Sequence, residues 1–418
     1  MRVLILSLNY APEPTGIAVY SNGLAETLVG LGHTVACVSA NPHFPRWKLF
    51  DGYPAWRWTK RQEAGVSVTR CPIYIPAKPN GAVRIAHYLS FLMTAAGPML
   101  WQARKFKPDV VLCVAPSLVS APLALFAARL AGAKSWLHFQ DFEVEAAQVT
   151  DNMRAGGAVA RAAGAFERSM IMAFDRVSSI SHEMCRKLIE KGRDAADVFE
   201  LRNWAEIDEI KPQPGSTYRS AWGIETPHVA LYSGSIARKQ GIETIVEVAA
   251  LLKDRADLTF VVCGNGPTRE AMEASARHLS NLRFYDLQPR ENLGELLNLA
   301  TVHLLPQRAD AADLVLPSKL ANMLASGRPV VAGVAPGRGL AREVEGVGLI
   351  ATPEDAPAMA AAIERVLDDR QLYQACAERA VQRARDHWSR STIIARFAEV
   401  LAALAERSAP MRGREAAL

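Results

Sequence analysis

Residues 229–253 read VALYSGSIARKQGIETIVEVAALLK and contain the unit that decides the fold. Val229–Ser233 is a short apolar run that predicts a buried strand, and Gly241–Lys253 has the apolar spacing of an amphipathic helix. A glycine-containing loop joins the two. A buried strand followed directly by a helix is half of a βαβ crossover, which predicts a parallel sheet covered by helices.

The same alternation extends in both directions along the chain. In the second half, further strands are expected at Leu258–Cys263, Leu282–Tyr285, Val302–Pro306 and Pro329–Ala332. In the first half, strands are expected at Arg2–Leu8, Thr34–Ala40, Val66–Cys71, Asp109–Ala115, Ser135–Phe139 and Arg176–Ile180. The stretch 202–215, with two prolines and mixed charge, is typical of a linker.

We therefore predict an α/β protein with two Rossmann-like, doubly wound parallel-sheet domains. A length of 418 residues exceeds the size at which a single core stops growing. The expected domains are residues 1–205 and 206–390, and residues 391–418 are expected to form a helix that packs back on the first domain.

The composition fits a globular protein in a reducing compartment. The six cysteines lie far apart and form no CxxC or Cys/His pair, so buried thiols are expected and a disulfide framework or zinc site is not. The N-terminal run MRVLILSLNY meets Pro12 instead of a cleavage site, which predicts a first strand and not a signal peptide. No uncharged apolar run reaches about 20 residues, so no membrane-spanning helix is expected.

The net charge of +5 is concentrated in the first half of the chain. Between Arg46 and Lys107, the sequence has eleven Lys and Arg residues but only two acidic residues, Asp51 and Glu63. The same stretch holds the aromatic residues Trp47, Phe50, Tyr53, Trp56, Trp58, Phe91 and Trp101. Cations and aromatic rings together favour an anionic membrane surface as a partner. A solvated loop with ordinary core aromatics is the alternative, and nucleic acid is disfavoured because no nucleic-acid-binding motif is present.

Two segments of the first half end predicted strands and are candidates for a site. The loop 9–17 places Gly16 just before a helix, where ligands bind in parallel sheets, although it lacks the GxGxxG fingerprint. His138 and Asp141 lie at the end of a later strand, where either side chain could orient or deprotonate a substrate hydroxyl. Asp141 is preferred because the loop is more accessible. A plain connection, a core histidine and a helix cap are the alternatives.

In the second half, the loop after Val229–Ser233 is suited to phosphate. Gly234 and Ser235 let the backbone approach a ligand, and Arg238 and Lys239 supply cations ahead of a helix. Such cations stabilise a diphosphate leaving group most strongly in the transition state. A basic helix start without a ligand is the alternative.

Two further loops of the second half have the same character. Residues 263–267, CGNGP, resemble a nucleotide-edge loop, although this short pattern alone is weak. In residues 313–319, DLVLPSK, Pro317 extends the chain at Leu316, and Ser318 can cap the next helix. Lys319 and the free amides of that helix would then face a diphosphate, with an ordinary capped helix as the alternative.

Together these features resemble the family-4 retaining glycosyltransferases of the GT-B fold. Among these, the chain is most similar to the colanic-acid-type fucosyltransferases of bacterial exopolysaccharide assembly. The segments that carry the resemblance are LNYAPEPTGIAVYS (8–21), HFQDFEVEAA (138–147), YSGSIARKQGIE (232–243), LLPQ (304–307) and AADLVLPSKLANMLASGRPVV (311–331).

The resemblance implies two domains that face each other across a cleft, an acceptor-binding domain (1–205) and a nucleotide-sugar-binding domain (206–390). It implies no metal, because cations and helix ends replace it, and no cofactor besides the nucleotide sugar. The expected donor-binding residues are Gly16, Gly234, Ser235, Arg238, Lys239, Gly264, Gly266, Asp313, Leu316, Ser318, Lys319 and Asn322.

The chain departs from the family pattern in two places. Many members carry an arginine and a lysine where this chain has Ser235 and Gln240, so the phosphate cations are expected to have moved to Arg238 and Lys239. The wider family has two glutamates near the donor sugar where this chain has Leu314 and Asn322, which leaves a carboxylate contact to the sugar in doubt.

The expected function is therefore transfer of a sugar, with retention, from a GDP- or UDP-linked donor such as GDP-fucose to a lipid-linked glycan acceptor. Asp141, with His138, would handle the acceptor hydroxyl, unless the donor phosphate takes the proton. The enzyme is expected in the cytoplasm, peripheral at the inner face of the membrane. A GT-B sugar-nucleotide epimerase and a non-catalytic nucleotide-sugar-binding scaffold are the alternatives.

Overall fold

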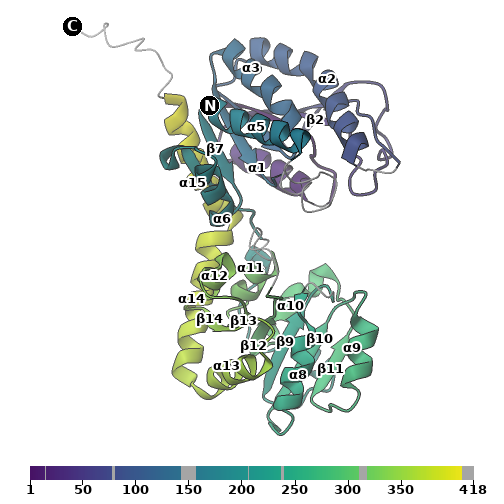
Figure 1. The fold of residues 1–418 in the computed structure, drawn as a ribbon, viewed down its shortest axis with the longest axis vertical. Helices are drawn as coiled ribbons and strands as arrows, with labels where there is room; N and C mark the ends of the chain where they lie inside the picture. The colour runs from purple at the N-terminus through teal and green to yellow at the C-terminus, as the bar shows by residue number, and fades with distance from the viewer. Residues whose placement is uncertain are drawn as a thin grey trace, which may run out of the picture. The chain divides into compact units, whose positions relative to one another are not determined.

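The chain divides into two compact units, each of which is described by itself. The computed structural model describes residues 1–14, 16–77, 81–142, 157–205, 207–236, 240–309 and 318–406. The first unit contains Met1–Asn203 and takes up the chain again from Ile393, and the second unit is Trp204–Thr392. Figure 1 labels many of the helices and strands of both units.

In the described part of the first unit, eight strands form one sheet in the order β3-β4-β2-β1-β5-β6-β7-β8. Their bounds are β1 Arg2–Ser7, β2 Thr34–Ala40, β3 Thr59–Glu63, β4 Val66–Cys71, β5 Val110–Ala115, β6 Lys134–Phe139, β7 Arg176–Ser179 and β8 Val198–Glu200. All neighbours pair in parallel except β3 with β4. The sequence does not predict β3 or β8, because β3 is a polar edge strand and β8 has three residues.

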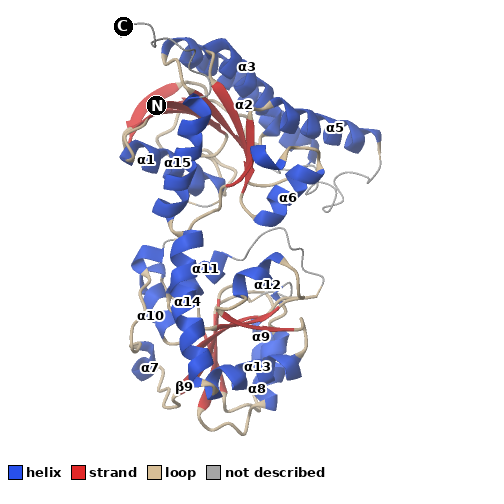
Figure 2. Cartoon of the chain, turned by 90° about the vertical axis from the view of Figure 1, so that its left-hand side faces the viewer, coloured by secondary structure: helices blue, strands red, loops and turns tan. Residues whose placement is uncertain are grey.

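Helices cover both faces of this sheet, as Figure 2 shows. Their bounds are α1 Ile17–Gly30, α2 Gly81–Lys105, α3 Ala121–Ala131, α5 Ala158–Ala173, α6 His182–Glu190 and α15 Arg390–Glu406. Helices α2, α3, α5 and α6 share a core with alternate residues of the central strands, among them Leu6 and Leu137. On the opposite face, Phe397 of α15 packs edge-on against Trp136, with ring centroids 4.9 Å apart. Strands buried on both faces explain the continuous apolar runs of the sequence.

The second unit has a six-stranded, all-parallel sheet among its described residues, in the order β11-β10-β9-β12-β13-β14. The strands are β9 His228–Ser233, β10 Leu258–Cys263, β11 Leu282–Tyr285, β12 Val302–Leu305, β13 Val330–Gly333 and β14 Gly348–Ala351. Only β14 is absent from the sequence prediction. Two doubly wound, mainly parallel sheets confirm the predicted α/β class.

The helices of the second unit again lie on both faces of its sheet (Figure 1). The α-helices are α7 Tyr218–Ala221, α8 Glu243–Leu251, α9 Arg269–Ala276, α10 Leu293–Asn298, α11 Ser318–Ala325, α12 Gly339–Val344, α13 Ala356–Asp368 and α14 Arg370–Trp388. Helices α8, α9 and α13 pack on one face, and α11, α12 and α14 on the other. Asp355 and Asp369 cap α13 and α14 by accepting hydrogen bonds from backbone N–H groups three residues later.

Two further expectations concern single residues and helix length. All six cysteines are buried and unpaired, as predicted. Within the described ranges, none of the helices combines the length and apolar character that crossing a lipid bilayer requires.

Candidate functional site

The strand order of the second unit reverses between β9 and β12, which lie side by side although three helices and two strands separate them in the chain. In open parallel sheets, ligands bind outside the carboxyl ends of the strands at this reversal. The loops that leave β9 at Gly234 and β10 at Gly264 both start at this edge. The phosphate site that the sequence predicts is therefore expected at this edge of the sheet.

Gly264 and Gly266 fit here because their loop packs backbone against backbone on the loop after β9. A Cβ at Gly264 would lie 1.8 Å from the carbonyl oxygen of Gly234, and a Cβ at Gly266 would lie 2.0 Å from that of Ile236. The Ile236 N–H donates to the Asn265 carbonyl at 2.9 Å. Gly234 itself has a φ of 133°, which side chains rarely adopt. The two loops therefore form one rigid backbone surface.

The loop after β12 contacts the other end of the same segment. Gly241, with φ of 63°, lies so close to the loop that an added Cβ would be 3.1 Å from the carbonyl carbon of Gln307 and 3.2 Å from the nitrogen of Arg308. Gly234 and Gly241 are thus each in close contact with a neighbouring loop along the sheet edge.

Lys319 brings a cation to this backbone surface. Its Nζ lies 4.1 Å from the centroid of the Tyr232 ring, and its Cδ would lie 3.7 Å from a Cβ at Gly234. The Tyr232 hydroxyl donates to the carbonyl of Ser235 at 2.6 Å, which fixes the ring below the ammonium group. Burial lowers the pKa of Lys319 to about 7, and no carboxylate among the described residues offsets this effect. An anion at this position would supply the missing counter-charge.

Asn322 adds an unsatisfied acceptor on the same helix, three residues after Lys319. Its Oδ1 is buried and has no hydrogen-bond partner among the residues that the structure describes. A buried amide oxygen without a partner costs about 1–3 kcal/mol, which a hydroxyl donor from a ligand would recover. The free N–H groups of the first turn of α11, which begins at Ser318, lie one turn before it. A cation, an acceptor and the first-turn amides therefore lie within residues 318–322 of α11.

In the first unit, a buried carboxylate orders the loop that leads to Gly16. Glu13 Oε1 accepts the backbone N–H groups of His43 at 2.8 Å and Phe44 at 2.9 Å, and its Oε2 accepts the Asn9 amide at 2.8 Å. The pKa of Glu13 is raised, because the effect of burial is larger than that of these hydrogen bonds, which lower it. The loops after β1 and β2 are thereby joined, and Gly16, with φ of 66°, packs on Phe44. The sequence analysis did not single out Glu13.

His138 lies inside the unit and not at its surface, and its role with the acceptor hydroxyl stays a prediction. Its Nδ1 lies 2.9 Å from Ser178 Oγ, and its Nε2 lies 3.0 Å from the amide nitrogen of Gln140. Gln140 in turn exchanges two amide hydrogen bonds with Asn203. Burial lowers the pKa of His138 to about 3, so the ring is neutral. The core-histidine alternative describes this residue.

Asp141 is exposed directly after β6, as the sequence predicts for a loop residue. Its Oδ1 accepts the backbone N–H of Phe142 at 2.8 Å, and Phe142 stacks on Phe139 with ring centroids 5.2 Å apart. The carboxylate is thus held by its own turn while it remains accessible to a substrate hydroxyl. Of the two candidate acid–base residues, Asp141 is exposed and His138 is buried.

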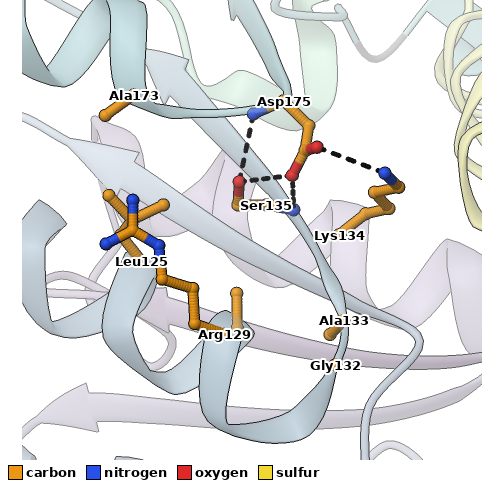
Figure 3. A pocket seen from close by; sticks show the side chains of 9 residues that line it. Leu125, Arg129, Gly132, Ala133, Lys134, Ser135, Ala173 and Asp175 are labelled. Atoms are coloured by element: carbon orange, nitrogen blue, oxygen red, sulfur yellow. Dashed lines mark hydrogen bonds and ion pairs between the residues drawn. The ribbon is translucent and has the colours of Figure 1, made fainter. Parts of the chain in front are cut away.

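A hollow of about 390 Å³ lies in the first unit at the opposite, amino edge of β6 (Figure 3). Part of its polar lining is already engaged, because Asp175 accepts hydrogen bonds from the N–H and hydroxyl of Ser135 and pairs with Lys134 at 3.3 Å. Because the hollow is at the amino edge of β6, it lies away from the carboxyl strand ends at which Rossmann-like sheets bind ligands.

Comparisons with known proteins agree with this geometry. The model of the glycosyl transferase 4-like domain matches residues 15–204, and that of glycosyl transferases group 1 matches residues 216–383. The putative colanic acid biosynthesis glycosyl transferase WcaI of Escherichia coli (strain K12) is 37% identical over 88% of this chain and 92% of its own length. The chain belongs to the family-4-like glycosyltransferases.

Solved structures show the fold of this glycosyltransferase. Sucrose-phosphate synthase from Thermosynechococcus elongatus has a TM-score of 0.69 at 16% identity and covers 97% of this chain and 99% of its own. HepE from Anabaena, in complex with UDP and glucose, has a TM-score of 0.61 at 15% identity and covers 96% of this chain and 100% of its own. The predicted GT-B fold is therefore confirmed.

Several predicted site residues of the glycosyltransferase lie outside the described ranges. These are Arg238, Lys239, Asp313 and Leu316, together with the side chain of Ser318. The structure brings together Gly234, Ser235, Gly264, Gly266 and Lys319, and it adds Tyr232, which the sequence analysis did not select. No group of three His, Cys, Asp or Glu side chains in the described part of the chain is arranged to hold a metal ion.

Proposed function

We propose that this glycosyltransferase transfers a sugar, with retention of configuration, from a nucleotide diphosphate donor to a lipid-linked glycan acceptor in exopolysaccharide assembly. The single observation that carries the proposal is Lys319, a half-buried cation without a described carboxylate partner, which lies against Gly234 at the reversal of the second sheet. A diphosphate is the anion that fits a cation, glycine backbone and free helix amides together. The likeness to WcaI supports the exopolysaccharide context.

In the proposed reaction, the acceptor oxygen forms a bond to the anomeric carbon while the bond from that carbon to the donor phosphate oxygen breaks. The electron pair of the broken bond passes to the diphosphate, where Lys319 and the first turn of α11 stabilise the growing charge. We propose that Arg238 and Lys239 add to this stabilisation. The proton of the acceptor hydroxyl passes either to the Asp141 carboxylate or to the departing phosphate oxygen.

The donor sugar would be oriented by Asn322, whose unpaired buried oxygen can accept a hydroxyl hydrogen bond. The Asn322 amide, at the position of a family glutamate, keeps an oxygen that accepts hydrogen bonds but carries no negative charge. GDP-fucose is one proposed donor, and a UDP-linked sugar is another, since HepE of the same fold was crystallised with UDP and glucose. A lipid-linked acceptor places the reaction, in this proposal, at the inner face of the cytoplasmic membrane, without a metal ion or a cofactor.

A panel of GDP- and UDP-linked sugars, with and without acceptor and read by the released nucleotide, tests the proposal. Lys319→Ala is expected to lower kcat/KM about 10²- to 10³-fold, because one preorganised donor to the developing charge is lost. Lys253→Ala, at an exposed lysine two residues after the end of α8, is the matched control and should leave the rate unchanged. Wild-type turnover by Lys319→Ala, or an epimerised donor without any acceptor, would contradict the proposal.

A further inference from the structure

Helix α2 presents an apolar ridge to solvent, although exposed faces of surface helices are normally polar. The ridge follows the four-residue spacing of the helix, so that its members lie one above the other. It runs through the exposed residues Ile85, Leu89, Met93, Gly97 and Trp101, a length of about 24 Å at 1.5 Å per residue. Met93, near its middle, is 71% exposed. Phe91, Ala95 and Met99 bind the other side of α2 to the core.

Neighbouring segments extend the ridge with aromatic rings. The indole N–H of Trp58 donates to the carbonyl of Thr94 in α2 at 2.8 Å, and Trp56, two residues before it, is 86% exposed. One turn earlier on the same side of α2, the backbone N–H of Tyr74 donates to Ser90 Oγ at 2.9 Å. We call this area the α2 ridge surface; it consists of Trp56, Trp58, Tyr74, Ile85, Leu89, Met93 and Trp101, all with large exposed side chains.

Cations gather at the C-terminal end of the α2 ridge surface, and acidic residues are nearly absent from the surrounding sequence. Helix α2 contains no Asp or Glu, and its last turn carries Arg104 and Lys105. Lys60 Nζ, from β3, lies 5.2 Å from the centroid of the Trp101 ring. Between residues 56 and 107, the single acidic residue is Glu63, whose carboxylate is paired with the buried Arg70 at 2.6 Å. The free charge around the apolar ridge is therefore positive.

We infer that the α2 ridge surface is where this glycosyltransferase docks on an anionic lipid bilayer. Tryptophan rings fit the headgroup depth, while the aliphatic side chains of Leu89 and Met93 reach the acyl boundary and the cations meet lipid phosphate. A second copy of the chain fits less well, because two cationic rims would repel each other. The inference rests on the proposed lipid-linked acceptor for its purpose, but binding itself needs no acceptor.

Flotation with lipid vesicles tests the inference on the full-length protein. The protein is expected to float with vesicles of phosphatidylethanolamine and phosphatidylglycerol and to stay behind with vesicles of phosphatidylcholine. Raising the salt from about 0.1 M to about 1 M shortens the Debye length from about 10 Å to about 3 Å, so binding should weaken. Each cation near the surface contributes about fivefold in affinity, so the double variant Arg104→Gln/Lys105→Gln should bind about 25-fold more weakly.

Substitutions on the ridge separate apolar docking from charge alone. Met93→Ser with Leu89→Ser is expected to weaken vesicle binding at least tenfold, because both side chains lose the contact with acyl chains. Leu251→Ser is the matched control, since Leu251 is 53% exposed on α8 of the second unit and lies far from the ridge in sequence. Turnover of a water-soluble acceptor analogue should be the same in all variants, which shows that they fold.

The outcomes distinguish this inference from the proposed function. Vesicle binding by the ridge variants equal to that of the wild type overturns the inference, and so does a wild type that binds neither vesicle. A wild-type dimer that Met93→Asp converts to a monomer also overturns it, because a second copy would then cover the ridge. Salt-sensitive, ridge-dependent flotation of a protein that transfers no sugar supports the docking surface and removes only the proposed function.

Discussion

The contact between the two glycine loops of the second unit gives the sharpest quantitative prediction. In Gly264→Ala, the new Cβ would lie 1.8 Å from the Gly234 carbonyl oxygen, whereas real Cβ atoms essentially never come under 3.0 Å. The loops must separate by 3.0 − 1.8 = 1.2 Å. Both partners are backbone atoms, so no side chain can move aside. Overpacking of this kind costs about 1–3 kcal/mol, and loss of the bond from the Ile236 N–H to the Asn265 carbonyl adds about 1 kcal/mol.

We therefore expect Gly264→Ala to destabilise the second unit by about 2–4 kcal/mol, which lowers its Tm by about 5–15 °C. Lys319 rests against Gly234, so the affinity for a nucleoside diphosphate should fall at least tenfold, a loss of about 1.4 kcal/mol. Differential scanning calorimetry measures the first effect, and isothermal titration with GDP and UDP measures the second.

Gly164→Ala is the matched control for this substitution. Gly164 lies within α5, and a Cβ there would meet no atom within 4 Å. Alanine should therefore stabilise the first unit by about 0.5–1 kcal/mol without any effect on nucleotide binding. The reasoning is refuted if Gly264→Ala melts with the wild type and binds nucleotide as tightly, since the two loops would then not be in rigid contact.

Three further predictions follow from single side chains. The pKa of Lys319 is lowered to about 7 in the free protein, and a bound diphosphate favours the charged form of the side chain. Nucleotide affinity should therefore fall as the pH rises above about 7. Titrations between about pH 6 and about pH 9 should show this fall in the wild type but not in Lys319→Met. Glu13→Ala should cost about 2–4 kcal/mol in thermal denaturation, because two buried backbone N–H groups lose their acceptor, whereas Glu13→Gln should keep most of the stability. His138→Phe should lower stability by about 1–3 kcal/mol and leave the pH profile of kcat unchanged, and a profile that loses a limb would restore His138 as an acid–base group.

The sequence predicts the sheets well because their central strands are buried on both faces. Such strands read as continuous apolar runs, of which Val229–Ser233 and Arg2–Leu8 are examples. The strand β3 escapes prediction because TKRQE has no apolar face, and it pairs only along one edge of the sheet. Helix α2 escapes because Gly97 and Pro98 interrupt its pattern, although the structure keeps the helix continuous through both.

The site is predicted in part, for a physical reason that differs between residues. The glycines of the second unit stand directly after strands, so their position at the sheet edge follows from the pattern alone. The ring of Tyr232 below Lys319 joins residues 87 positions apart (319 − 232), which no local pattern reveals. The sequence leaves open whether His138 is a core histidine, because its burial depends on Ser178, its register partner on the neighbouring strand β7.

The six buried thiols have a consequence for reactivity. Burial raises the pKa of Cys37, Cys71, Cys113 and Cys185 to about 12 and that of Cys263 to about 11. At neutral pH, fewer than about one in 10³ of these groups is then a thiolate, the form that reacts with alkylating reagents. The folded chain should thus react very slowly with such reagents, so that the rate of alkylation reports the rate at which the structure unfolds and exposes the thiols. Mass-spectrometric mapping of the labelled sites would time the two units separately, since the four thiols with a pKa near 12 belong to the first and Cys263 to the second.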